Sequence, residues 1–257
     1  MPRPRPCRAF PVSPLVLLSV IALGGLELDA RQPASSAGPS QATLDRIQRE
    51  CLRSYPEGLL AEMASGAQEI PPTVEADPKA QMTFLDKELP LDKGLFYPIL
   101  LEDLLPAFER YVAPGIRFLD LGSGDGRVVF MANVLGADAV GIEYDRQMVA
   151  ISRQALKTLR ELVDPGRLRI VQGDFFAASW SGYDVIYYFD LGSFEQERVR
   201  EKLKRELEPG ALLLVGHEQV PFPGLELVTA FPSPEARHPE VKVYRQPGEP
   251  TATATRD

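Results

Sequence analysis

Short apolar runs alternate with amphipathic segments over much of this 257-residue chain. Runs rich in Val, Ile, Leu, Phe and Tyr that end at Gly, Asp or Pro predict buried strands, because they are too short for helices. Between them, apolar residues recur every three or four positions, which predicts helices. The predicted strands are 117–121, 139–143, 168–172, 183–189 and 211–217, and the predicted helices are 99–112, 125–135, 145–163 and 194–207. Alternation of the two predicts an α/β fold, with a mostly parallel sheet covered by helices on both faces.

Turn and cap residues mark the ends of these elements. Asp145 is a predicted helix N-cap, Pro165 and Gly166 end the helix over 145–163, and Pro106 predicts a kink or boundary in the helix over 99–112. Two further strands, at 226–230 and 241–245, are expected to form an edge pair after the parallel strands.

The N-terminal part of the chain has a different pattern. Three arginines precede an apolar run over 15–26, which as a helix would cover about 18 Å, short of the roughly 30 Å hydrocarbon core of a membrane. Residues 1–30 therefore resemble a secretory signal, and an uncleaved tether through residues 10–28 and a misassigned start codon stay open as alternatives. Residues 31–42 are expected to be a flexible linker. The remaining expected divisions are an N-terminal extension over 43–94 with a helix at 43–53, a main domain over 95–247 and a disordered tail over 248–257.

Charge and composition exclude some classes of function. The net charge is −8, and nucleic-acid affinity depends on Lys and Arg contacts to phosphate, so we do not expect a nucleic-acid partner. The cysteines, Cys7 and Cys51, lack the spacing of metal ligands, and the only histidines are His217 and His238. We therefore expect no metal site.

Three glycines follow the predicted strand 117–121 in the segment FLDLGSGDGRVVF. Ligands of doubly wound sheets bind beyond the carboxyl ends of the strands, and glycine lets a ligand approach the backbone there. In the dinucleotide pattern G-x-G-x-x-G, counted from Gly122, the last glycine would fall at Arg127, so the pattern fails. Glu143 closes the next strand, where a carboxylate can accept hydrogen bonds from both hydroxyls of a ribose. The alternative for Glu143 is an ordinary charge at a strand end.

The motifs LDLGSGDGR, AVGIEYD and VQGDFF, in this order, resemble the class I S-adenosylmethionine-dependent methyltransferases. Within that class, the chain is similar to the Dot1-type domain and to the small mitochondrial lysine methyltransferases and their prokaryotic relatives. The resemblance implies a Rossmann-like, doubly wound sheet of seven strands that is mostly parallel, preceded here by a helical N-terminal extension. It also implies S-adenosyl-L-methionine as the cofactor and a protein lysine as the methyl acceptor. The N/D-P-P-Y/F motif of amino-methylating relatives is replaced by YYFDLGSF.

The resemblance also assigns roles to individual residues. The glycine loop would contact the methionine part and the ribose, Glu143 would hold the ribose, and Asp174 would bond the adenine amino group. Tyr97 would lie over the cofactor. The full set of cofactor residues implied is Tyr97, Asp120, Gly122, Ser123, Gly124, Gly126, Glu143, Gly173, Asp174 and Phe175. A turn or helix-cap role for Asp174 stays open.

The end of the strand over 183–189 is the predicted acceptor site. Lysine has a pKa of about 10.4 and must lose a proton before it accepts a methyl group. A pocket of aromatic side chains with one carboxylate would guide the ammonium and desolvate it. Asp190 and Tyr188 are the predicted catalytic residues, with Tyr187 and Phe189 beside them. Adjacent tyrosines in a strand point to opposite faces, so at least one is expected in the core, and Asp190 can instead be a helix cap.

Three functions remain open from the sequence alone. The first is methylation of a protein lysine, the second is methylation of a small molecule, and the third is a cofactor- or nicotinamide-binding domain without catalysis. His217 and Glu218 are expected to be a solvated strand end rather than an acid–base pair. The N-terminus suggests export or membrane tethering, whereas the cytosolic supply of S-adenosylmethionine argues for cytosolic access. Deletion of residues 1–42 is expected to leave cofactor binding intact.

Overall fold

A computed structural model describes residues 38–56, 99–190, 195–218, 221–232 and 240–247, all within one compact unit. The predictions for residues 1–30, for the tether over 10–28, for Tyr97 and for the tail over 248–257 fall outside the described residues. The helices are α1 (Gln41–Arg53), α5 (Leu101–Tyr111), α6 (Arg127–Val134), α7 (Arg146–Thr158) and α8 (Glu195–Glu206). The strands are β1 (Arg117–Leu121), β2 (Asp138–Glu143), β3 (Leu168–Gln172), β4 (Val185–Phe189), β5 (Leu212–Gly216), β6 (Glu226–Phe231) and β7 (Val241–Arg245).

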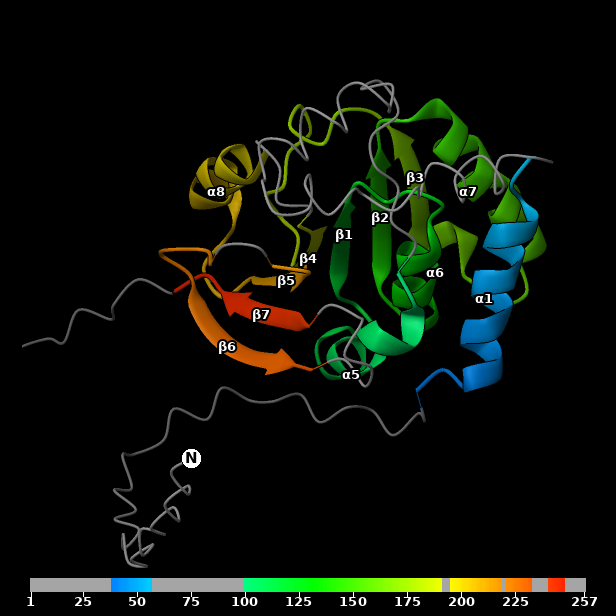
Figure 1. Cartoon of the computed structure of the whole chain (residues 1–257), viewed down its shortest axis with the longest axis horizontal. Helices are drawn as coiled ribbons and strands as arrows, with labels where there is room; N and C mark the ends of the chain where they lie inside the picture. The colour runs from blue at the N-terminus through cyan, green and yellow to red at the C-terminus, as the bar shows by residue number, and fades with distance from the viewer. Residues whose placement is uncertain (1–37, 57–98, 191–194, 219–220, 233–239, 248–257) are drawn as a thin grey trace, which may run out of the picture. The chain divides into compact units, whose positions relative to one another are not determined.

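The seven strands form one sheet in the order β3-β2-β1-β4-β5-β7-β6 (Figure 1). β1 to β5 are parallel, and β7 pairs antiparallel with both β5 and β6. The strand order reverses between β1 and β4, and ligands of doubly wound sheets bind at such a point, beyond the carboxyl ends of the strands. The predicted fold class, including the edge pair, is confirmed.

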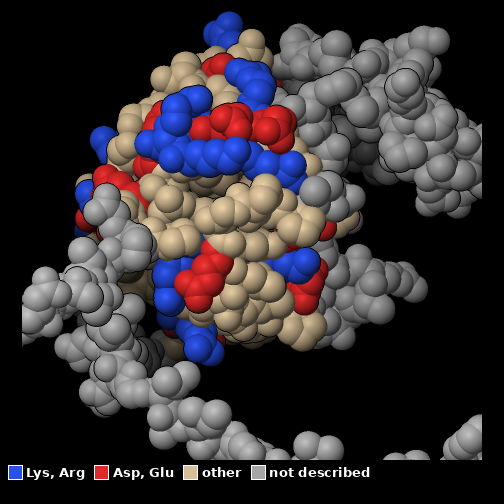
Figure 2. Space-filling view, turned by 90° about the vertical axis from the view of Figure 1, so that its left-hand side faces the viewer, with Lys and Arg blue, Asp and Glu red and all other residues tan. Residues whose placement is uncertain are grey.

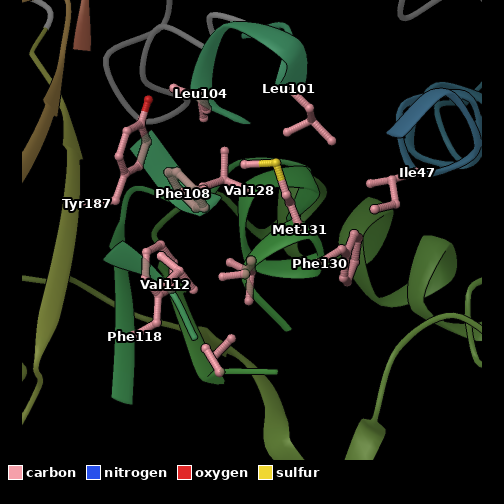
Figure 3. Close-up of a cluster of buried hydrophobic side chains, with 14 of the residues drawn as sticks. Ile47, Leu101, Leu104, Phe108, Val112, Phe118, Val128, Phe130, Met131 and Tyr187 are labelled. Carbon is pink, nitrogen blue, oxygen red and sulfur yellow. The ribbon is translucent and has the colours of Figure 1, made fainter. Parts of the chain in front are cut away.

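Alternating side chains of the sheet build two separate cores. On one face, Phe118 of β1 and Tyr187 of β4 pack with α1, α5, α6 and α7, and Figure 3 shows both side chains beside Phe108 of α5. On the other face, Leu119 of β1 and Tyr188 of β4 pack with α8. Burial of both faces explains why the parallel strands read as continuous apolar runs in the sequence.

Three predicted boundaries move in the structure. α1 begins at Gln41, inside the range expected to be linker, because Ser40 is its N-cap and its side chain accepts from the Thr43 amide. Pro106 lies inside α5 and is no boundary. α7 ends at Thr158, not at residue 163, because the chain turns after Leu159 and the Asp164 amide donates to Asn133 Oδ1 at 2.7 Å.

Among the described helices, none combines the length and the apolar character needed to cross a membrane. α1 is amphipathic instead: its buried residues are Leu44, Ile47 and Cys51, and the helix contacts α5, α6 and α7. α1 therefore contributes to the core on this face of the sheet.

Candidate active site at the carboxyl ends of the strands

The loop between β1 and α6 contains three glycines in the left-handed region of backbone space. Gly122, Gly124 and Gly126 have φ angles of 78°, 53° and 84°. A Cβ at Gly126 would lie 3.0 Å from atoms of Phe130 and Ser152, whereas a Cβ at Gly122 would meet no atom of the described residues within 4 Å. The amides of Gly122 and Ser123 donate to the Ile142 carbonyl at 2.9 and 3.0 Å, which ties the loop to β2. The loop is thus packed against protein at one glycine and open at another, as a backbone cradle for a ligand requires.

Glu143 at the end of β2 accepts a hydrogen bond from this loop. Its Oε2 accepts from the Gly124 amide at 2.8 Å and its Oε1 accepts from the Asp145 amide at 2.7 Å. Burial raises the pKa of Glu143, and the backbone hydrogen bonds oppose the shift. A carboxylate has about four lone-pair sites, so two amides fix its position and leave acceptor capacity for a sugar diol.

Asp120 in β1 is a second buried carboxyl of the same site. It is 2% exposed, and its Oδ2 has no hydrogen-bond partner among the described residues. Burial, followed by the charges of Glu143 and Asp125, raises the pKa of Asp120 well above its usual range. Tyr187 lies opposite Asp120 on β4, and its hydroxyl also lacks a partner within the described ranges. Unsatisfied buried acceptors are rare in native proteins, so Asp120 marks a place where a donor is expected to bind.

Asp125 and Arg127 are site residues that the sequence reasoning missed. Asp125 is fully buried, and the Arg127 guanidinium donates to both of its carboxylate oxygens, the shortest contact being 2.6 Å. The sequence did contain a signal for these two residues, because an Asp and an Arg flank Gly126 in a loop between two apolar elements. Their partner Tyr55 could not be found this way, because it lies 70 residues away.

The turn after β3 lies beside Glu143, as the predicted adenine site requires. The Gly173 amide donates to the Glu143 carbonyl at 2.8 Å. Asp174 is exposed, and its Oδ1 accepts from the Phe176 amide at 2.8 Å, so its side chain stabilises the turn. Its Oδ2 remains as a further hydrogen-bond acceptor. Phe175 is half-buried. The sequence reasoning also missed Tyr144, which follows Glu143 and is 64% exposed.

Tyr187 and Tyr188 near the end of β4 are buried, and Phe189 is half-buried. Tyr188 is 4% exposed and packs near Phe222, while Tyr187 lies in the opposite core. Asp190 is fully buried and accepts a hydrogen bond from Gln196 Nε2 at 2.5 Å. The catalytic roles of Tyr188 and Asp190 stay predictions, and the structure adds that Gln196 holds the carboxylate.

The end of β5 differs from the expected solvated strand end. His217 is exposed, stacks on Phe189 with ring centroids 5.6 Å apart, and has a φ of 57°. The side chain of Glu218 is only 2% exposed and accepts from the Tyr244 hydroxyl. The expectation of a solvated strand end is therefore right for His217 and wrong for Glu218. The side chain of Glu218 is buried because it pairs with Tyr244 of β7, a contact that the local sequence does not reveal.

The charges of the site discriminate between classes of cofactor. In their ionised forms, Asp120 and Glu143 add negative potential, which favours a cation and repels a pyrophosphate. Arg127 is occupied by Asp125, and the Arg127 amide at the start of α6 donates to Asp125 Oδ1 at 3.2 Å. A phosphate at this helix N-terminus would therefore compete with a built-in carboxylate. The residues fit a cationic adenosyl cofactor better than a dinucleotide. Among the described residues, no group of three His, Cys, Asp or Glu side chains could hold a metal ion.

On the face shown in Figure 2, where α8 and β6 lie, basic side chains stand beside acidic ones. Ion pairs within α8 join Arg200 to Glu197, Lys204 to Glu201 and Lys202 to Glu206. The described residues of this face thus form no continuous basic surface of the kind that binds a phosphate backbone.

Comparison with known proteins places these motifs in context. The model of the ANTKMT methyltransferase domain matches residues 120–228. The chain is 31% identical over 127 residues to a rat lysine N-methyltransferase that is named for a subunit of ATP synthase, covering 46% of this chain and 56% of that protein. For the human protein of the same name the identity is 33% over 105 residues, with 41% and 42% covered. The chain thus spans about half the length of these relatives.

A solved structure is similar over most of its own length. It is an RNA methyltransferase from Salinibacter ruber in complex with S-adenosyl-L-homocysteine, with a TM-score of 0.50 and 27% identity. The similarity covers 62% of this chain and 97% of that chain.

Proposed function

We propose that this chain, which belongs by its fold and its sequence matches to the class I S-adenosylmethionine-dependent methyltransferases, methylates the side-chain nitrogen of a protein lysine. The observation that carries the proposal is the hydrogen bond from the glycine loop to Glu143, beside the buried Asp120. The lysine is suggested by the rat and human relatives, whose names specify lysine N-methylation of a protein.

Residues of three strand ends would hold the cofactor. Glu143 would bind the ribose, Asp120 would face the cationic methionine part, and Asp174 with Phe175 would contact the adenine. The exposed Tyr144 offers a further aromatic surface for the base. S-adenosylmethionine, when bound, supplies a methyl group that its sulfonium already activates. The protein therefore has to bind, orient and desolvate, and orientation alone can supply about 7–11 kcal/mol of a barrier.

Asp190 and Tyr188 are the proposed catalytic residues. A carboxylate held by Gln196 at the end of β4 would attract the lysine ammonium toward the site. The apolar surroundings of Tyr188 would disfavour the charged form of the amine and so lower its pKa, which promotes loss of the proton.

Labelling distinguishes the candidate acceptors. The full-length protein is incubated with methyl-labelled S-adenosylmethionine and a cell lysate, and aliquots are treated with protease, treated with ribonuclease or filtered. We expect protease-sensitive label that is recovered as methyl-lysine after hydrolysis. Label that is lost with ribonuclease or passes the filter would refute lysine methylation, and tight NAD binding would refute the cofactor.

Substitution of Asp190 separates catalysis from cofactor binding. We expect Asp190→Asn to lower turnover by about 100-fold or more, the typical contribution of one positioned acid–base group, without weakening the binding of S-adenosylhomocysteine. Asp184→Asn is the matched control, because this carboxylate precedes the other end of β4 and forms an exposed ion pair with Arg117. Equal turnover of the two variants would remove Asp190 from the mechanism.

A further inference from the structure

The Asp125–Arg127 pair joins the glycine loop to two segments that lie outside the region matched by the methyltransferase domain. Arg127 Nη2 lies 2.6 Å from Asp125 Oδ2, and the Arg127 Nε donates to both carboxylate oxygens at 3.0 and 3.1 Å. The two side chains are 6% and 1% exposed. This is a buried, bidentate ion pair, the geometry in which Arg fixes a carboxylate most firmly.

The end of α1, the turn after it and the segment just before α5 all contact this pair. The Tyr55 hydroxyl donates to Asp125 Oδ2 at 3.2 Å, and Cys51 Sγ lies 3.6 Å from the Asp125 carbonyl oxygen. Arg127 Nη1 donates to the Ile99 carbonyl at 3.1 Å. Contacts with residues 51, 55 and 99 therefore meet at one point of the loop.

The same loop is also held by Glu143. The Gly124 amide donates to Glu143, and the next residue, Asp125, turns its carboxylate toward Tyr55 and Arg127. The Gly124 amide belongs to the peptide unit just before the one that joins Gly124 to Asp125, and the two planar units meet at the Gly124 Cα. A displacement of Asp125 therefore shifts the backbone that bonds the proposed ribose carboxylate.

Stability alone is a weak reason for such a pair. Desolvation of two buried charges can exceed their attraction, and buried pairs can often be replaced by apolar residues without loss of stability. What the pair provides here is a single fixed geometry for a loop whose glycines would otherwise permit many.

We propose that Tyr55, Asp125 and Arg127 are positioning residues of the cofactor loop, so that α1 is a working part of the cofactor site. This inference rests on the proposed function, because it assigns these residues to the binding of S-adenosylmethionine. They act through Gly124 and Glu143 and need not touch the cofactor themselves.

Tyr55→Phe in the full-length chain removes only the hydroxyl that joins α1 to Asp125. Because this hydrogen bond acts on the ligand only through the loop, we expect part of its free energy to reach the site, so that the affinity for S-adenosylhomocysteine in calorimetry is weaker by about five- to tenfold. Tyr111→Phe is the matched control: its hydroxyl is also buried, but has no hydrogen-bond partner in the described part of the chain. We expect the affinity of this control to equal that of the wild type.

Cys51 provides a second readout that a purely structural role would not change. Its thiol is fully buried against the loop, and burial raises its pKa well above its usual range, so alkylation requires α1 to separate from the loop. In a Cys7→Ser background, bound S-adenosylhomocysteine should slow alkylation of Cys51. The slowing should be smaller in Tyr55→Phe, because ligand binding and α1 docking are then less coupled.

The outcomes separate the two proposals. A wild-type protein that binds no S-adenosylhomocysteine overturns the proposed function and this inference with it. If the wild type binds, but Tyr55→Phe matches Tyr111→Phe in affinity and in ligand protection of Cys51, only the positioning role is overturned. A lower melting temperature of Tyr55→Phe with unchanged affinity has the same meaning.

Discussion

Asp120 combines a cost to folding with a use in binding. Its carboxyl is buried without a described partner for Oδ2, and burial raises its pKa well above the usual range. An acid whose pKa is raised by folding contributes stability that is present below its ordinary pKa of about 3.9 and is lost as the pH rises through the raised value. The ionised form is therefore the destabilising one.

Asp120→Asn is expected to make the ligand-free protein more stable at pH 8 than the wild type, because the buried charge is removed. The difference should shrink as the pH falls toward the ordinary pKa of aspartate, where both side chains are neutral. The same change should weaken binding of S-adenosylhomocysteine by about tenfold, through loss of a charge facing the ligand ammonium. Thermal melts and calorimetry at several pH values measure both effects. A stability difference that does not change with pH would contradict the assigned pKa shift.

Single residues differ in how far the sequence revealed them. The glycine loop, Glu143 and Gly173 could be found because each ends or follows a predicted strand, and parallel strands bring their carboxyl ends to one edge. The contact of Tyr55 with Asp125 could not, because it depends on how α1 docks. The buried state of Glu218 likewise depends on Tyr244, which a later antiparallel strand supplies.

The bounds of strands and helices also differ in how far the sequence revealed them. The bounds of β1, β3 and β7 agree with the sequence, because an apolar run between Gly, Pro and Asp specifies a buried strand locally. The predicted end of α7 was five residues too late, because the periodic apolar pattern continues to Leu162. In the structure the helix has ended by then, and the Asp164 amide donates to Asn133. Local patterns thus predict which elements form, and contacts between elements decide where they end.

Gly141 shows how closely the loop, α6 and β2 pack. It lies in the middle of β2 opposite Asp120, and an added Cβ would lie 2.6 Å from Ser123 Cβ and 2.6 Å from Val129 Cγ2. Glycine inside a strand often marks such a close approach.

Gly141→Ala is expected to push the loop and α6 away from β2. Overpacking of this kind costs about 1–3 kcal/mol, so thermal unfolding should shift down by several degrees and cofactor affinity should fall as well. Gly173→Ala is the control for stability, because a Cβ there would meet no atom within 4 Å in the part of the chain that the structure describes. Equal melting temperatures for the two variants would show that the packing at Gly141 can relax.

The chain as a whole separates into a part that builds the cofactor site and an N-terminal part that, we propose, does not. Because Ser40 caps α1, a deletion of residues 1–42 removes the cap and the first residues of the helix. A deletion meant to test only the N-terminal part must therefore end before Ser40. A chain that begins at residue 38 keeps Ser40 and every described element. We expect it to bind S-adenosylhomocysteine with the affinity of the full-length protein.

A chain that begins at residue 57 should behave differently, because it lacks α1 and the Tyr55 hydroxyl. Removal of α1 exposes the apolar surface that Leu44, Ile47 and Cys51 cover and leaves Asp125 without one of its donors. We expect a lower melting temperature and an affinity for S-adenosylhomocysteine that is reduced more strongly than in Tyr55→Phe. The Ser40→Ala variant of the full chain separates helix stability from the contact with the loop, since loss of an N-cap costs about 1 kcal/mol at the far end of α1. If that variant weakens the ligand as much as Tyr55→Phe does, α1 acts through its helicity rather than through its contact with Asp125.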